Sequence, residues 1–257
     1  MSTPRDPGAA DPYRDDLAYI HDAGHGDVAR AAARALLDEL RAAGHARGTI
    51  VDLGCGSGIL AAAVSAAGFD VVGHDVSEAM VALARRRAPR ATFHVGSFVS
   101  AALPPSVAVS AVGEVLNYVF DPANDEAARH RFFARVHEAL VPGGVLLFDV
   151  AGPDRVPPGG TARSGATGED WAVVAETRRE PGAELVTRTI TTFRLVDGAY
   201  RRDAEVHPFV LIDPPALADQ LRAIGFAVRT VPGYGPASLP PGVVSLVARK
   251  AARTPGG

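Results

Sequence analysis

The sequence predicts an α/β protein built on a doubly wound, mostly parallel sheet. The β-forming residues Ile50, Val51 and Leu53 run directly into a glycine-rich turn, and an alanine-rich helix follows over 59–67. Apolar strand-like runs and helical segments then alternate along the chain. With 257 residues, 47% of them hydrophobic, the chain can bury the core of one such domain with an addition. A strand, a glycine turn and a helix in this order predict a ligand-binding loop.

The other core elements follow from apolar periodicity and from capping residues. Asp27 is a good N-cap for a helix over 28–43, and Gly44 ends it. Segment 13–26 looks too polar and glycine-rich for a core helix and is expected to fold over a pocket. The remaining strands are expected at 69–75, 91–95, 107–112 and 145–150, and helices at 78–87, capped by Ser77, and 125–140.

The chain after residue 150 departs from a minimal fold of this class. Residues 151–170 are rich in Gly and Pro and predict a loop, and three segments of β character follow, at 171–178, 185–195 and 199–211. Asp197-Gly198 is a hairpin signal. We therefore expect a small antiparallel sheet inserted before a helix at 214–224. Strands at 226–231 and 243–248, joined by a loop over 232–242, form a closing antiparallel hairpin.

The glycine spacing indicates which ligand the loop binds. Gly54, Gly56 and Gly58 follow G-x-G-x-G, and Ile59 stands where the third glycine of a dinucleotide fingerprint would fall. The charge of Asp52 is unfavourable beside a pyrophosphate but favourable beside an ammonium or sulfonium.

Three stretches together resemble the class I S-adenosylmethionine-dependent methyltransferases: Val51–Gly58, Phe69–Asp75 and Val76–Met80. The resemblance implies a seven-stranded sheet with S-adenosylmethionine as cofactor. It places Asp75 on the ribose diol and Val76 against the adenine. Ser97 stands where the family often has an acid that binds the adenine amino group. The expected cofactor-binding residues are Asp52, Gly54, Cys55, Gly56, Gly58, Asp75, Val76, Met80, Ser97, Phe98 and Glu114.

Catalytic and substrate-binding residues are expected at the same sheet edge and on the insertion. Glu114, Asn117 and Tyr118 follow the fourth strand, where open α/β sheets bind ligands. His207, beside Pro208, is a candidate general base at a strand edge. The expected catalytic residues are His207, Glu114 and Tyr118, and the expected substrate-binding residues are Tyr19, His21, His25, Asn117 and Trp171.

Alternatives remain open for several of these residues. His21 and His25 have the spacing of helical metal ligands, but no further ligand cluster is evident, so no metal is expected. Asp149 either faces the substrate or is satisfied at the sheet edge. Most arginines of the insertion should form a solvated face, with one binding a substrate carboxylate as the alternative; they are Arg178, Arg179, Arg188, Arg194, Arg201 and Arg202.

The composition limits the classes of partner that the protein is expected to bind. The net charge is −3 and Lys250 is the only lysine, which leaves no basic field for nucleic acid. Cys55, the single cysteine, excludes an internal disulfide. No signal peptide or long apolar run is evident, so we expect a cytoplasmic monomer or homodimer that does not bind membranes. The expected parts are a disordered tail at 1–11, an N-terminal cap and cofactor-binding core at 12–150, a substrate cap at 151–212, the end of the core sheet at 213–250 and a tail at 251–257.

The expected activity is methyl transfer from S-adenosylmethionine to an oxygen, nitrogen or carbon of a small molecule by in-line displacement. Two other classes are alternatives: a non-catalytic binding protein of the same fold, and a nicotinamide-dependent oxidoreductase, which Asp52 and Ile59 disfavour. Methylation of proteins is a weaker option because the inserted cap suits a small substrate.

Overall fold

The computed structural model describes residues 12–183, 185–235 and 237–252. Its main element is a seven-stranded sheet in the order β10-β13-β5-β4-β1-β2-β3, in which β13 is antiparallel to both neighbours and the other pairs are parallel. The predicted fold class is confirmed. The strands are β1 Thr49–Leu53, β2 Asp70–Asp75, β3 Thr92–Val95, β4 Ser106–Ala111, β5 Leu140–Ala151, β10 Phe226–Val231 and β13 Val243–Lys250.

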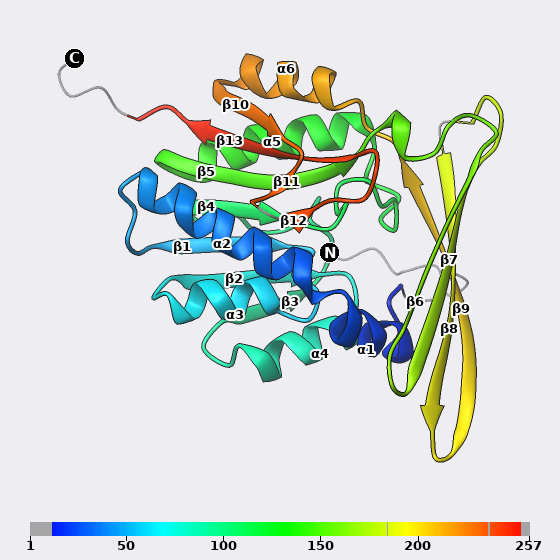
Figure 1. Cartoon of the computed structure of the whole chain (residues 1–257). Helices are drawn as coiled ribbons and strands as arrows, with labels where there is room; N and C mark the ends of the chain where they lie inside the picture. Colours follow the sequence, from blue (N-terminus) through cyan, green and yellow to red (C-terminus); the bar gives the residue numbers. More distant parts are fainter. Residues whose placement is uncertain (1–11, 184, 236, 253–257) are drawn as a thin grey trace.

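Helices cover both faces of this sheet (Figure 1). On one face Leu36, Leu60 and Val64 pack with strand residues such as Ile50, and on the other Phe132, Phe133 and Leu221 pack against strand residues such as Phe148. Burial on both sides explains why the central strands β4 and β5 are rich in apolar residues. The helices are α1 Asp15–Gly24, α2 Gly26–Ala42, α3 Ile59–Ala66, α4 Glu78–Arg87, α5 Glu126–Ala139, α6 Pro214–Ile224 and the 3₁₀ helix η1 Pro153–Arg155.

The inserted segment forms a separate four-stranded antiparallel sheet, here called the cap, as the sequence predicts. Its strands run in sequence order: β6 Thr161–Thr167, β7 Trp171–Arg179, β8 Leu185–Val196 and β9 Ala199–Val210. The cap stands at one side of the core, and α1 lies between α2 and the cap strands (Figure 1). The cap can therefore cover the carboxyl ends of the core strands.

Four local predictions are wrong. Segment 13–26 contains a helix, α1, because Leu17 and Ile20 find an apolar partner surface in Trp171, Val173 and Ile190 of the cap. Helix α2 begins at Gly26, so His25 rather than Asp27 is its N-cap residue. Edge strand β6 lies in the predicted loop 151–170, and a short hairpin, β11 Gly233–Tyr234 and β12 Ala237–Ser238, lies in the predicted loop 232–242.

Other local predictions are confirmed. Ser77 caps α4 as predicted, since its hydroxyl accepts from the Met80 N–H. The helix predicted over 125–140 is α5, and Asp125 precedes it and accepts from the Ala128 N–H. The predicted tail at 1–11 and residues 253–257 of the tail predicted at 251–257 lie outside the described residues.

Candidate functional site

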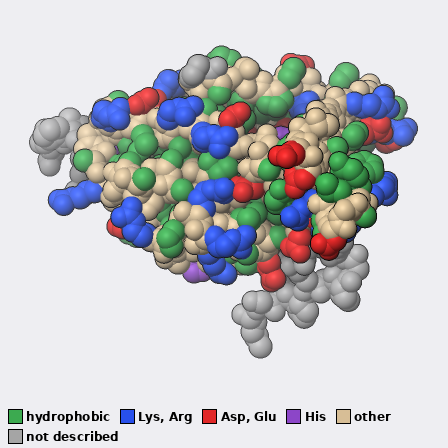
Figure 2. Space-filling view, turned by 60° about the horizontal axis from the view of Figure 1, so that its bottom comes forward, with side chains coloured by type: hydrophobic (Ala, Val, Ile, Leu, Met, Phe, Trp, Pro, Cys, Tyr) green, Lys and Arg blue, Asp and Glu red, His purple; other side chains and the backbone are tan. Residues whose placement is uncertain are grey.

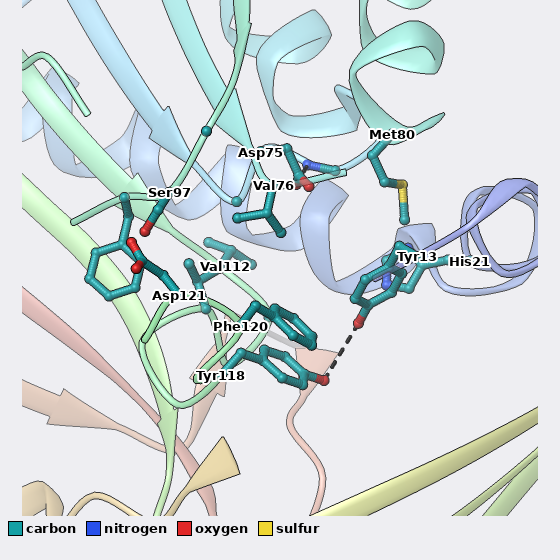
Figure 3. Close-up of a pocket in the computed structure, with 16 residues that line it drawn as sticks. Tyr13, His21, Asp75, Val76, Met80, Ser97, Val112, Tyr118, Phe120 and Asp121 are labelled. Atoms are coloured by element: carbon teal, nitrogen blue, oxygen red, sulfur yellow. Dashed lines mark hydrogen bonds between the residues drawn. The ribbon is translucent and has the colours of Figure 1, made fainter. Parts of the chain in front are cut away.

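A cavity opens where the parallel strands β1, β2, β3 and β4 end (Figure 3). The loops after these four strands supply most of its wall, and the segment around α1 supplies the rest. This is where an open α/β sheet binds ligands. We call it the first cavity; it is lined by Tyr13, His21, Gly54, Gly56, Asp75, Val76, Met80, Gly96, Ser97, Phe98, Val112, Gly113, Val115, Tyr118, Phe120 and Asp121.

The carboxylate of Asp75 ends β2 on the floor of this cavity. Its Oδ2 accepts the Gly56 N–H at 2.8 Å and its Oδ1 accepts the Ser77 N–H at 2.9 Å. Burial raises the pKa of Asp75, and the backbone donors oppose that rise. Each oxygen keeps further acceptor capacity, so the carboxylate can receive a pair of ligand hydroxyls.

Two glycines open the cavity wall to a ligand. Gly56 has φ +53° and Gly113 has φ +97°, and a Cβ built on either would meet no atom within 4 Å. A side chain at either position would enter the cavity and would also strain the backbone. The backbone is therefore shaped for close approach by a ligand.

The two ends of the first cavity differ in chemistry. Ser97 and Asp121 lie at the end opposite Tyr13 and His21, with Val76 and Val112 between them (Figure 3). The Ser97 hydroxyl accepts the Val99 N–H at 3.2 Å, and Asp121 Oδ1 accepts the Ala123 N–H at 2.9 Å. Oxygen acceptors at one end and apolar side walls suit a flat heterocycle that carries an amino group.

A second cavity adjoins the first beneath the cap. The two share Tyr13, His21, Val112, Gly113 and Tyr118, so these residues form a common wall. Burial, with His25 nearby, lowers the pKa of His21 to about 4, so its imidazole is neutral at pH 7. The residues that line only the second cavity include Leu17, His25, Val28, Glu114, Asp149, Arg155, Val173, Ala175, Arg188, Ile190, Leu239 and Val243.

Tyr13 connects the cap, the start of α4 and both cavities. Its N–H donates to Glu205 Oε2 at 2.7 Å, and its carbonyl accepts from the Ser77 hydroxyl at 2.8 Å. Its phenol lies 3.5 Å from that of Tyr118 (Figure 3). Tyr13 has φ +53°, a strained value for a non-glycine residue, so these contacts hold it in place.

A charged cluster lies in the second cavity. Arg188 Nη1 donates to Glu114 Oε2 at 2.8 Å and to the Tyr118 hydroxyl. Arg155 Nε lies 3.6 Å from the other oxygen of Glu114. Glu114 has φ +60°, so the backbone after β4 is strained where it presents this carboxylate.

The other expected acid of this region, Asp149, is satisfied at the sheet edge. Its carboxylate accepts the backbone N–H groups of Gly113 and Glu114 and the hydroxyl of Tyr234. Burial raises the pKa of Asp149 to about 6. It lines the second cavity but already holds three donors.

Most of the predicted site residues line one cavity or both. Gly54, Gly56, Asp75, Val76, Met80, Ser97 and Phe98 line the first, His25 and Glu114 line the second, and His21 and Tyr118 line both. The structure does not bring the others to either cavity; they are Asp52, Cys55, Gly58, Tyr19, Asn117, Trp171 and His207.

Three of these outlying residues make contacts behind the cavities. His207 is 1% exposed, and its Nε2 pairs with Glu205 Oε2 at 2.8 Å. The amide of Asn117 binds backbone groups of Ala151 and Val210 and so ties β5 to the end of β9. Asp52 is buried against the hydroxyl of Ser110, and burial, with Asp75 nearby, raises its pKa to about 7.

Two more of them support α1. The Tyr19 hydroxyl donates to Asp170 at 2.8 Å, and the Arg194 guanidinium lies over the Tyr19 ring. Trp171 packs against Leu17 and Ile20. The expectation of a solvated arginine face is wrong for Arg188, which is buried. Arg194 and Arg201 bind the buried Asp16, and the Arg201 side chain remains exposed.

Sequence reasoning missed several lining residues. Tyr13 was part of a segment expected over a pocket, but its own sequence position gives no sign of the φ value or of the Glu205 contact. Gly113 follows the fourth strand and was a detectable signal, since glycine at a strand end favours close approach of a ligand. The other missed residues of the first cavity are Gly96, Val112, Val115, Phe120 and Asp121.

Neither a metal cluster nor a membrane-crossing helix is seen in the described ranges. No group of three or more His, Cys, Asp and Glu residues there could hold a metal ion. None of the helices combines the length and the apolar character that a membrane crossing needs.

Comparison with known proteins agrees with this architecture. Residues 50–144 match the family model described as a methyltransferase domain. A Geobacillus sp. (strain WCH70) protein, provisionally named a methyltransferase, is 33% identical over 106 residues, which are 39% of this chain. The match spans 41% of that relative's length.

Solved structures extend the likeness to nearly the whole chain. An S-adenosylmethionine-dependent methyltransferase from Clostridium acetobutylicum covers 92% of this chain and 98% of its own, with TM-score 0.76 and 16% identity. CalS10, an amino pentose methyltransferase from Micromonospora echinaspora solved with its cofactor, covers 91% and 96%, with TM-score 0.71 and 22% identity. KedS8, a sugar N-methyltransferase from Streptoalloteichus sp., covers 98% of both chains, with TM-score 0.71 and 21% identity.

The chain therefore has the class I methyltransferase fold, and residues 50–144 match the methyltransferase-domain model. The resemblance predicted from the glycine loop and the second strand is confirmed.

Proposed function

We propose that this protein is an S-adenosylmethionine-dependent methyltransferase that transfers a methyl group to an oxygen, nitrogen or carbon atom of a small molecule. One observation carries the proposal: the Asp75 carboxylate lies beside the Gly56 backbone on the floor of a cavity at the carboxyl ends of the parallel strands. A carboxylate there can accept both hydroxyls of a ribose, and the open glycine position gives the ligand access.

The first cavity fits this cofactor along its length. Asp75 would bind the ribose, and Val76, Met80 and Phe98 would contact the adenine. Ser97 and Asp121 are the acceptors placed to bind an adenine amino group, and Asp121 supplies the carboxylate that the position of Ser97 lacks. The reactive end would then lie near Tyr13 and Tyr118 at the common wall.

Gly54 and Gly58 are proposed to shape the loop, and this role requires no direct contact with the cofactor. A Cβ on Gly54 would collide with Val115, and one on Gly58 would collide with Ala84 of α4. Asp52 in β1 and Cys55 in the loop are buried and line neither cavity, so their proposed contribution is to the shape and the electrostatics of the loop.

When bound, the cofactor supplies an already activated methyl group, so this chain mainly has to position the acceptor. The two cavities adjoin at the residues that line both of them. A substrate bound in the second cavity would meet the cofactor's methyl group there. The cap covers the second cavity and would exclude water. Catalysis would come from proximity and orientation.

A proton acceptor is needed only for a protonated acceptor atom. His21 lines both cavities and is neutral at pH 7, so it is better placed for this role than His207, which lines neither. We propose that His207 supports Glu205 and the rings of Tyr13 and Tyr118. Tyr118 accepts from Arg188 and keeps its own hydroxyl proton to donate to a substrate.

The substrate class and the setting are part of the same proposal. The second cavity is enclosed by α1, α2, the cap and the loop before β13, which suits a small molecule. CalS10 and KedS8 act on sugars, which supports a small substrate without naming it. Acidic and basic side chains are interspersed on the face shown in Figure 2, which gives no support to a nucleic-acid partner. A cytoplasmic monomer or homodimer, with core, cap and closing segments at 12–150, 151–212 and 213–250, completes the proposal.

Transfer of an isotopically labelled methyl group tests the activity. The purified protein would be incubated with labelled S-adenosylmethionine and a panel of amino sugars, phenols and small carboxylic acids. We expect a labelled product and one S-adenosylhomocysteine for each methyl transferred. Cofactor binding without transfer to any class would favour the non-catalytic binding protein instead.

A further inference from the structure

The second cavity contains a guanidinium that is fixed in place and only partly used. Arg188 is 9% exposed, and its Nε donates to Thr177 while its Nη1 binds Glu114 and Tyr118. Its plane also packs on the Phe209 ring, 4.8 Å from the ring centre. Among the described residues, Nη2 has no hydrogen-bond partner although it is buried. Two N–H donors therefore remain free on a rigid group.

A second free donor flanks the same glutamate. Arg155 Nε is buried without a hydrogen-bond partner in the described part of the chain, and it lies 3.6 Å from Glu114 Oε1. Arg188 binds the opposite oxygen of Glu114. The two guanidinium groups are thus held on either side of one carboxylate, and both arginines line the second cavity.

Buried polar groups without partners are costly, so a ligand that pairs with them gains affinity. Asp149 does not supply the missing acceptor, since its carboxylate already holds Gly113, Glu114 and Tyr234. The rest of the cavity is largely apolar, with Leu17, Val173 and Ile190 among its lining residues.

We propose that the second cavity binds its substrate through a carboxylate, which accepts from Arg188 Nη2 and Arg155 Nε, and holds an apolar body against the cap. Each carboxylate oxygen can accept one charge-assisted hydrogen bond, one from each guanidinium. The proposal rests on the proposed function, because it assigns this cavity to the substrate. The far end of the substrate would then point to Tyr118 and His21 at the common wall.

Binding of matched acids and amides tests this subsite. The probes are phenylacetate, 3-phenylpropanoate and cyclohexanecarboxylate, each paired with its uncharged primary amide, titrated into protein saturated with S-adenosylhomocysteine. We expect at least one acid to bind about tenfold or more tightly than its amide, since charge-assisted hydrogen bonds exceed neutral ones. Equal affinity of every acid and its amide, or no binding by any acid, would overturn the proposal.

Three variants test whether the preference for an acid over its amide depends on Arg188 and Arg155. Arg188→Lys keeps the charge but removes the planar fork, and Arg155→Met removes the second donor; each should weaken the acid about tenfold. Arg178→Met is the matched control, because Arg178 is a cap arginine on the exposed face that pairs with Glu180 and lines neither cavity. Equal weakening in the control would contradict the assignment. If Arg188→Lys does not fold, the Arg155→Met variant alone tests the subsite. Arg155→Met should fold, because the ion pair of Arg155 with Glu114 is long and its loss costs little stability.

The same titrations keep the two proposals distinguishable. S-adenosylhomocysteine should bind all variants within about twofold of the unchanged protein, since these arginines do not line the first cavity. If the cofactor product fails to bind while acids still bind through Arg188, the cofactor assignment fails and the carboxylate subsite stands. If it binds and no acid does, only the subsite fails.

Discussion

Tyr13 and Glu205 join the start of the described chain to the cap across 192 residues of sequence: the Tyr13 N–H donates to Glu205 Oε2 at 2.7 Å. The other oxygen of Glu205 accepts the Arg14 N–H at 2.9 Å. Glu205 is 5% exposed and also pairs with His207. A cap residue therefore positions the tyrosine that stands between the two cavities.

Replacing Glu205 with glutamine should loosen this segment. The amide keeps one acceptor oxygen where the carboxylate has two, so one of the backbone N–H groups loses its partner. We expect a loss of about 1–3 kcal/mol of stability and faster amide hydrogen exchange over 13–24, measured by mass spectrometry. Glu176→Gln, on the exposed side of the cap, is the control. Unchanged exchange over 13–24 would show that the contacts of Glu205 with Tyr13 and Arg14 do not hold α1 in place.

Gly56→Ala should weaken cofactor binding in addition to its cost to folding. Its new methyl group would enter the first cavity, at a φ of +53° that disfavours alanine. We expect S-adenosylhomocysteine to bind at least about tenfold more weakly in calorimetry, with a folding cost of about 1–2 kcal/mol. Gly182→Ala is the control, since Gly182 also has a positive φ and free space but lies in the turn between β7 and β8. Equal affinity in the two variants would exclude Gly56 from the cofactor site.

The sequence was sufficient for the core because its signals are local there. The glycine loop, the acid at Asp75 and the cap at Ser77 each specify a strand end or a helix start within a few residues. The same stretches of sequence also predicted several of the residues that line the first cavity. Asp121 was missed because the loop after β4 carries no comparable pattern.

The rest depends on contacts between distant segments. Helix α1 is stable because Trp171 and Ile190 of the cap cover its apolar side, and no local pattern near Leu17 reports this. Strand β6 forms by pairing with β7, in spite of its Gly-rich surroundings. The expectation for His207 at an open rim could not anticipate that Tyr13 and Phe120 enclose its ring.

Asp52→Asn should change the pH dependence of stability. In the folded protein the pKa of Asp52 is raised to about 7, against an ordinary value of 3.8. Between these pH values the folded state keeps the proton that the unfolded state loses, so stability falls as pH rises through this window. We expect the variant to gain stability relative to the unchanged protein, on the order of a few kcal/mol, between pH 4 and pH 8.

Denaturant unfolding at both pH values measures this gain. Asp70→Asn is a suitable control, because Asp70 is exposed at the other end of the neighbouring strand. All other titrating groups are common to the proteins, so their contributions cancel in the difference. A constant stability difference across the range would mean that Asp52 is ionised in the folded protein at low pH.

Asp121→Asn should reduce the preference for an amino group on the purine. The carboxylate accepts hydrogen bonds at the end of the first cavity where the adenine is proposed to lie, next to Ser97. We expect the affinity ratio of S-adenosylhomocysteine to S-inosylhomocysteine to fall about three- to tenfold, the effect of one hydrogen bond. Glu126→Gln, at the exposed start of α5, should leave the ratio unchanged. An unchanged ratio in the Asp121 variant would move the adenine away from this end.

Calorimetric titration with S-adenosylhomocysteine, comparing Asp75→Asn with Asp70→Asn, tests the central claim most directly. Both aspartates belong to β2, but only Asp75 lines the first cavity. We predict micromolar binding by the unchanged protein and by Asp70→Asn, and a loss of at least about tenfold in Asp75→Asn, because the amide accepts from only one ribose hydroxyl. Equal binding by the two variants, or no binding by the unchanged protein, would contradict the account.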